Sequence, residues 1–72
     1  MIIYNIILNK TRKEFWVAEP KYTNRIAEIV AALETKYEVS YYPTSQEQLE
    51  ADVVIENQRG YKKADHYLDW DL

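Results

Sequence analysis

The segment at residues 2–8, Ile-Ile-Tyr-Asn-Ile-Ile-Leu, constrains the fold more than any other part of the sequence. In an extended strand, successive side chains point to opposite faces, so alternate residues share a face. Here both sets of alternate residues are mostly apolar. A strand of this kind is typical of the centre of a sheet that is covered on both sides. We therefore expect residues 2–8 to form a central strand.

The following residues predict a hairpin and a helix. Polar residues 9–13 precede a second alternating segment at residues 14–19. Because so short a connection cannot hold a crossover, these two strands should pair antiparallel. The apolar side chains then recur at helical spacing, which predicts a helix over about residues 23–36 with Thr23 or Asn24 as its N-cap.

The second half of the sequence predicts two more strands around a short helix. Residues 37–42 alternate with a period of two, and we expect Pro43 to end this third strand. Thr44 fits the N-cap of a capping box, which predicts a short helix over about residues 45–51. Residues 52–56, Asp-Val-Val-Ile-Glu, are β-branched and apolar at their centre and predict a fourth strand.

The length and composition indicate one small folded domain over residues 1–72. The chain has 72 residues, 47% of them apolar, a net charge of −3 and no Cys, which argues against disorder and against a disulfide framework. A turn at residues 57–60 leads to an acidic, aromatic tail at residues 61–72, which we expect to be weakly helical or irregular. The predicted fold is α+β in the order ββαβαβ plus this C-terminal tail. Its mixed, mostly antiparallel four-stranded sheet is packed by one main helix at about residues 23–36.

Residues 30–55 also carry a resemblance to a known family. Their predicted order of helix, strand, short helix and strand includes the run Ala-Asp-Val-Val-Ile at residues 51–55. This stretch resembles the sugar-specific phosphocarrier domains of bacterial uptake systems, which implies a small parallel α/β arrangement. Those carriers accept phosphate on a Cys or His after the first strand. Residues 9–12 here contain neither, so the resemblance bears on the fold and not on the activity.

The sequence offers little chemistry for catalysis or metal binding. A nucleophile must lie beside a base, but the chain has no Cys and only one His, His66. Asp65, Asp69 and Asp71 could join His66 in a metal site, yet adjacent side chains diverge on a helix. A single Gly cannot form a phosphate-binding loop. We therefore expect no enzyme activity, no cofactor and no metal.

We also expect a soluble, cytoplasmic protein that makes no membrane contact. A membrane span needs an apolar run of about 18 residues, and none occurs. The first residues lack the basic region and the cleavage site of a secretory signal.

An excess of aromatic residues leads to the main functional hypothesis. The chain has seven Tyr and two Trp, more than its predicted inward positions need, and these residues dominate protein interfaces. The tail alternates acidic and large apolar residues, so it either docks in a basic, apolar groove of a partner or folds back over the sheet. The candidate interface residues are Trp16, Tyr42, Glu47, Glu50, Tyr61, Asp65, Tyr67, Asp69, Trp70 and Asp71.

We therefore expect non-catalytic binding to another protein, as a stoichiometric inhibitor or an adaptor. In size, acidity and lack of catalytic residues the chain is similar to the small inhibitors that bacteriophages make against host enzymes or defence complexes. This similarity of type implies a partner that handles nucleic acid, with acidic side chains occupying its binding site.

Two alternatives stay open. Residues 1–25 carry five basic and two acidic residues, a net charge of +3, and their basic cluster adjoins aromatic rings, a combination used in single-strand binding. The candidate residues for nucleic acid are Lys10, Arg12, Lys13 and Trp16. The overall negative charge makes nucleic acid the less favoured partner. The other alternative is a structural subunit that self-associates, for example as a homodimer, through an unpaired strand edge.

Overall fold

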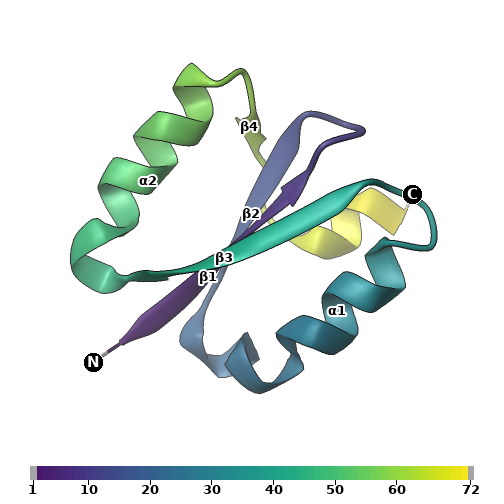
Figure 1. Cartoon of the computed structure of the whole chain (residues 1–72), viewed down its shortest axis with the longest axis horizontal. Coiled ribbons are helices and arrows are strands. Elements are labelled where there is room, and N and C mark those ends of the chain that lie inside the picture. Colours follow the sequence, from purple (N-terminus) through teal and green to yellow (C-terminus); the bar gives the residue numbers. More distant parts are fainter. Residues whose placement is uncertain (1, 72) are drawn as a thin grey trace.

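A four-stranded mixed sheet lies between helical layers in the computed structural model, which describes residues 2–71 (Figure 1). The elements are β1 (Ile3–Asn9), β2 (Glu14–Ala18), the 3-10 helix η1 (Pro20–Arg25), α1 (Ile26–Leu33), β3 (Val39–Ser45), α2 (Gln46–Gln58), β4 (Lys62–Lys63) and the 3-10 helix η2 (Tyr67–Asp71). The strand order is β3-β1-β2-β4, and β4 pairs with β2 in parallel. The predicted α+β fold with a mixed, mostly antiparallel sheet is confirmed.

The central position of β1 is also confirmed. It pairs antiparallel with β2 on one side and with β3 on the other. Its neighbouring residues Ile6 and Ile7 are both fully buried, although they point to opposite faces. Ile7 packs in a cluster with the apolar face of α1, whereas Ile6 packs in a separate cluster beneath α2. Each face of the sheet therefore has its own core.

The predicted helix at residues 23–36 is present, but its first part is a 3-10 helix and it ends earlier, at Leu33. η1 occupies Pro20–Arg25, and α1 begins at Ile26 with Arg25 as its N-cap. Neither Thr23 nor Asn24 caps it, because both already lie inside η1. Pro20 follows the end of β2 and is also the first residue of η1. Proline is favourable at the first position of a helix, where its missing N–H would have no partner within the helix.

The prediction of a fourth strand at residues 52–56 is wrong, because this segment continues α2. Ser45, rather than Thr44, is the N-cap, and its hydroxyl accepts a hydrogen bond from the backbone N–H of Gln48 at 3.3 Å. No Gly or Pro interrupts the chain from there to Gly60. The parallel α/β arrangement implied by the resemblance to phosphocarrier domains is therefore not formed.

The third strand does not end at Pro43 but runs through it. Lys10 N–H donates to the Glu38 carbonyl at 2.8 Å, and Gln46 N–H donates to the Ile2 carbonyl at 3.1 Å. Bonded pairs recur at every second residue of an antiparallel ladder, so the even-numbered residues of β3 bond to β1. Pro43 is therefore at an outward position, where its missing N–H disrupts no pairing within the sheet.

Both edges of the sheet are consequently poor sites for adding a strand. On β3, Pro43 removes a donor from the open edge. On the other side, β4 has only two residues, Lys62 and Lys63, and both side chains are exposed. Short, charged or proline-containing edges discourage strand pairing between molecules. These features weigh against the self-associating subunit considered from the sequence.

α2 ends at the C-cap Arg59, and the glycine that follows reverses the chain. Gly60, with φ +97°, donates to the Asn57 carbonyl at 3.1 Å, and Tyr61 N–H donates to the Glu56 carbonyl at 3.0 Å. This pair of bonds is the Schellman motif, which turns the chain from the helix toward β4. The tyrosine that follows the glycine is buried beneath α2, so the turn also places a core residue.

We predict that Gly60→Ala lowers the free energy of unfolding by about 1–2 kcal/mol, because a Cβ is unfavourable at positive φ. No heavy atom lies within 4 Å of the added Cβ, so a steric clash contributes nothing. Urea denaturation followed by circular dichroism measures the change. Gly60→Asn is the control and should lose less, since Asn tolerates this region better. Equal losses for the two variants would contradict the explanation.

Candidate functional site

Three of the aromatic rings proposed for an interface belong to the core. Trp16 is 4% exposed, Tyr61 8% and Trp70 0%. Trp16 and Trp70 pack with α1 on one face of the sheet, and Tyr61 packs beneath α2 on the other. The structure thus places these three side chains inside the domain and not on a contact surface. The sequence did not show this, because it predicted neither the path of the tail nor the second helical layer.

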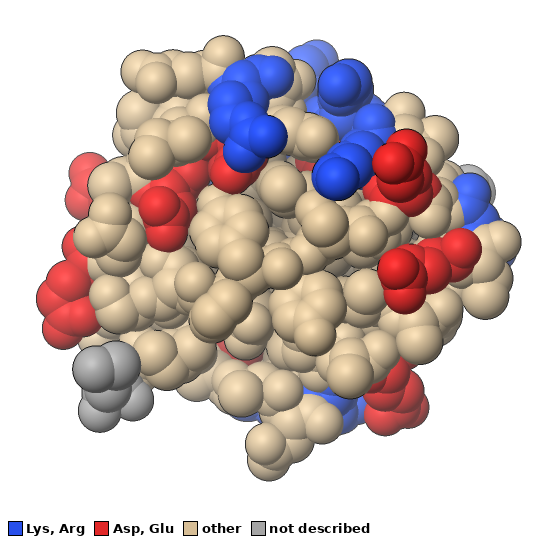
Figure 2. Space-filling model, viewed as in Figure 1, with Lys and Arg blue, Asp and Glu red and all other residues tan. Residues whose placement is uncertain are grey.

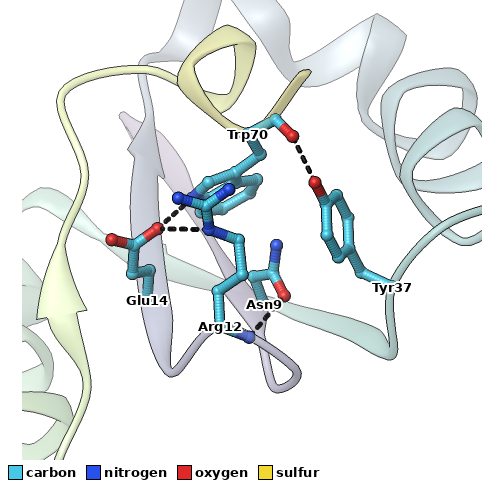
Figure 3. A network of polar contacts seen from close by, with 5 residues as sticks. All are labelled: Asn9, Arg12, Glu14, Tyr37 and Trp70. Atoms are coloured by element: carbon cyan, nitrogen blue, oxygen red, sulfur yellow. Dashed lines mark hydrogen bonds and ion pairs between the residues drawn. The ribbon is translucent and has the colours of Figure 1, made fainter. Parts of the chain in front are cut away.

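Polar contacts fix Trp70 at both ends (Figure 3). Its indole Nε1–H donates to Oε1 of Glu14 at 2.8 Å, and the same oxygen accepts from Nε of Arg12 at 3.2 Å. The hydroxyl of Tyr37 donates to the Trp70 backbone carbonyl. The C-terminal segment is therefore held to β2 and to the chain that follows α1.

Tyr67 completes a cluster of four rings on the same face of the sheet. The ring centroid of Trp16 lies 5.1 Å from that of Tyr22, 4.9 Å from that of His66 and 5.0 Å from that of Tyr67. His66 Nδ1 accepts from Leu68 N–H at 3.2 Å, and its Nε2 lies 3.1 Å from the Tyr22 hydroxyl oxygen. Of the two readings left open for the tail, folding back over the sheet is the one that the structure shows.

Deleting residues 65–72 should unfold the domain. Loss of a buried Trp costs about 3–5 kcal/mol, which equals the whole stability expected of a core in a chain of this size. Far-UV circular dichroism and amide dispersion in NMR spectra report the outcome. Trp70→Ala should have the same effect, whereas Leu68→Ala, at an exposed position of η2, should cost less than about 0.5 kcal/mol. A well-dispersed NMR spectrum from the truncated chain would contradict the conclusion that the C-terminal segment is part of the core.

The inner face of α2 is attached to β3 by hydrogen bonds that two of its carboxylates accept from hydroxyl groups of the strand. Glu56, only 2% exposed, accepts from the Tyr42 hydroxyl at 2.7 Å, and Arg59 lies 3.4 Å from the same carboxylate. One turn earlier, Asp52 accepts from the Thr44 hydroxyl at 2.5 Å. Leu49 and Val53 fill the space between helix and sheet. The orientation of α2 is therefore set by polar contacts as well as by apolar packing.

Burial and the hydrogen bond to Glu56 raise the pKa of Tyr42 above its ordinary value. The folded state consequently holds this proton more tightly than the unfolded state does. The resulting stabilisation is fully present below the unfolded pKa of about 10 and is lost as the pH rises through the folded pKa.

We predict that Tyr42→Phe lowers the free energy of unfolding by about 1–3 kcal/mol at neutral pH, because the buried Glu56 carboxylate loses a donor. The difference from the unaltered chain should shrink above about pH 10. Tyr41→Phe is the matched control, because Tyr41 is the neighbouring residue and is 45% exposed; it should change stability by less than about 0.5 kcal/mol. Urea denaturation across the pH range measures both, and a difference independent of pH would contradict the assignment.

The outer face of α2 is the candidate functional site. Val54 and Ile55 are 48% and 46% exposed, although the same helix buries a glutamate on its inner face. Together with Glu47, Glu50 and Ala51 they line a hollow that is nearly flat and open to solvent. These five side chains are spaced at i, i+3, i+4, i+7 and i+8, which is one stripe of a helix. We call this stripe the α2 outer face.

The remaining predicted interface residues do not join this face. Tyr42 is half-buried beneath α2, and Asp65 and Asp69 are exposed at the opposite layer, near η2. The side chain of Asp71 lies outside the described part of the chain. Only Glu47 and Glu50 of the predicted set are brought together at the hollow. Sequence reasoning missed Val54 and Ile55 because it assigned them to a fourth strand, and it missed Ala51 because it ended the short helix at that residue.

A helical interpretation of residues 46–58 would have found these residues. Ser45 and Gly60 are suitable cap residues, and no helix-breaking residue lies between them. On a helix, Leu49, Val53 and Glu56 share one stripe, which leaves Val54 and Ile55 on another. The β-branched run favoured the strand prediction instead.

The three basic residues proposed for nucleic acid lie in the β1–β2 turn and are exposed, but Trp16 is not beside them on the surface. β4 runs alongside this turn, because Lys62 N–H donates to the Lys13 carbonyl at 3.0 Å. Figure 2 shows basic side chains gathered along the upper rim, over the turn and β4, and acidic ones along the left flank, over α2, with further acidic side chains on the right. We call this group the basic end: Lys10, Arg12, Lys13, Arg59, Lys62 and Lys63.

Within residues 2–71, the structure has no group of three or more acidic, His or Cys side chains placed to hold a metal ion. None of the helices described is long and apolar enough to cross a membrane. Comparisons with protein-family models, with curated proteins and with solved structures find no match to this chain. Function must therefore be inferred from the chain's own surfaces.

Proposed function

We propose that the chain is a non-catalytic module that binds another protein through the α2 outer face. It acts stoichiometrically, as an inhibitor or adaptor, by covering a surface of that partner. The observation that supports this proposal most directly is the exposure of Val54 and Ile55 on a helix that hides Glu56. Helices presenting such a stripe commonly bind in apolar grooves of partners.

The inner contacts of α2 explain why this face stays free. Reversing the helix would bury Val54 and Ile55 but would expose the hydrogen-bonded Asp52 and Glu56 to water and lose their contacts to β3. Complete burial of a Val or Ile side chain contributes about 1.5–3 kcal/mol, so the half-exposed pair still has substantial apolar surface to offer a partner. The two side chains therefore serve as anchors.

The charges on the face define the chemistry of the partner. Glu47 and Glu50 border the hollow, and none of its lining residues is basic. A partner that presents an apolar groove bordered by Lys or Arg is complementary to this arrangement. A second copy of the chain is not, because pairing two α2 outer faces would bring four carboxylates together.

The proposal predicts a specific cross-link from α2. A photoreactive phenylalanine analogue at position 54 of the full chain should cross-link a cellular protein, whereas the same analogue at Ala31, an exposed position of α1, should not. The cross-linked peptide of the partner should be rich in Lys or Arg and apolar residues. Mass spectrometry identifies it.

Substitutions then test the contact. Ile55→Lys and Glu47→Lys should each reduce capture of that protein at least about tenfold, the equivalent of 1.4 kcal/mol. Ala27→Lys, a charge change on the exposed side of α1, should leave capture unchanged. Cross-links that occur equally from both positions, or only to a second copy of the chain, would overturn the proposal.

A further inference from the structure

We infer that the basic end binds the phosphate backbone of double-stranded nucleic acid without reading its sequence. This surface is distinct from the α2 outer face and does not depend on the function proposed for it. Its six members come from the β1–β2 turn, the end of α2 and β4, and all six side chains are exposed.

Tertiary contacts bring these basic side chains together from distant parts of the sequence. Besides the backbone bond between Lys62 and Lys13, β4 pairs with the start of β2, opposite Glu14 and Phe15. Nζ of Lys13 lies 5.5 Å from the ring centroid of Tyr61, so the turn also reaches the chain just after the end of α2. The turn and β4 therefore form one continuous basic surface.

Acidic neighbours neutralise only part of this charge. Glu14 pairs with Arg12 at 3.2 Å, and the buried Glu56 lies 3.4 Å from Arg59. Glu38 lies beside the turn, where its backbone N–H donates to the Thr11 hydroxyl. Six basic residues against these three acidic residues and the exposed Asp65, two residues after β4, give a local net charge of +2, although the whole chain carries −3. A polyanion is therefore attracted to this end and repelled by the acidic flank over α2.

The burial of the aromatic rings favours double-stranded over single-stranded nucleic acid as the ligand. Single-strand binding combines basic residues with exposed rings on which bases stack. Here Phe15, Trp16 and Tyr61 are all buried, so the basic end offers no stacking surface. The lysines and arginines can still neutralise backbone phosphates, which requires no access to the bases. A duplex, whose phosphates lie on its outside, meets this requirement.

Fluorescence anisotropy of the full chain with a labelled duplex of about 20 base pairs tests the inference, with the matching single strand as a second probe. For about four phosphate contacts, duplex affinity should fall roughly 100-fold between about 50 and 200 mM salt. Lys10→Glu with Lys63→Glu should weaken binding at the lower salt at least about tenfold and reduce the salt slope. Lys21→Glu with Arg25→Glu makes the same charge change in η1, away from the basic end, and should change affinity less than about threefold.

Circular dichroism verifies that all variants are folded. Lys10→Gln with Lys63→Gln is a second pair of substitutions, which removes the two positive charges without adding negative ones. The inference is overturned if no duplex binding occurs below about 100 µM at the lower salt, or if both Glu pairs weaken it equally. Single-strand binding tighter than duplex binding would overturn the choice of ligand. Polyglutamate that competes as well as the duplex would assign the surface to an acidic polypeptide instead.

Discussion

Burial of β1 on both faces is the constraint on which the rest of the structure depends. A strand with apolar side chains on both sides needs a layer of other elements above and below it. In a chain without cysteine, α1 with η2 provides one layer and α2 provides the other. The C-terminal segment is needed for the first layer, because the ring of Trp70 completes the packing of Ile7, Trp16 and α1. The tail that resembled a free binding segment is therefore part of the core.

The same constraint explains the unusual distribution of residues on α2. The second layer is held partly by polar contacts, from Tyr42 to Glu56 and from Thr44 to Asp52. Because these bonds fix which side of the helix meets the sheet, the apolar residues on the other side remain exposed. Stability and proposed binding thus use opposite faces of one helix, and substitutions can separate them.

The two surfaces differ in sign and in construction. The α2 outer face is apolar with an acidic border and lies on a regular helix, whereas the basic end is built from a turn and a two-residue strand. Both sheet edges are unsuited to strand addition, whereas the helix face and the turn each carry exposed side chains. The ligands proposed for these surfaces, a protein groove with basic borders and a phosphate backbone, follow from this difference in charge.

The central strand, the hairpin, the helix near residues 23–36 and the α+β class were predictable from the sequence alone, because each depends on local periodicity or on a short connection. Contacts with the sheet stabilise residues 52–56 as a helix, since the carboxylates of Asp52 and Glu56 accept hydrogen bonds from Thr44 and Tyr42 on β3. Tertiary structure also decided which rings are buried and that Lys62 and Lys63 join the turn. These outcomes depend on contacts between residues far apart in the chain, and such contacts leave no periodic pattern in the sequence.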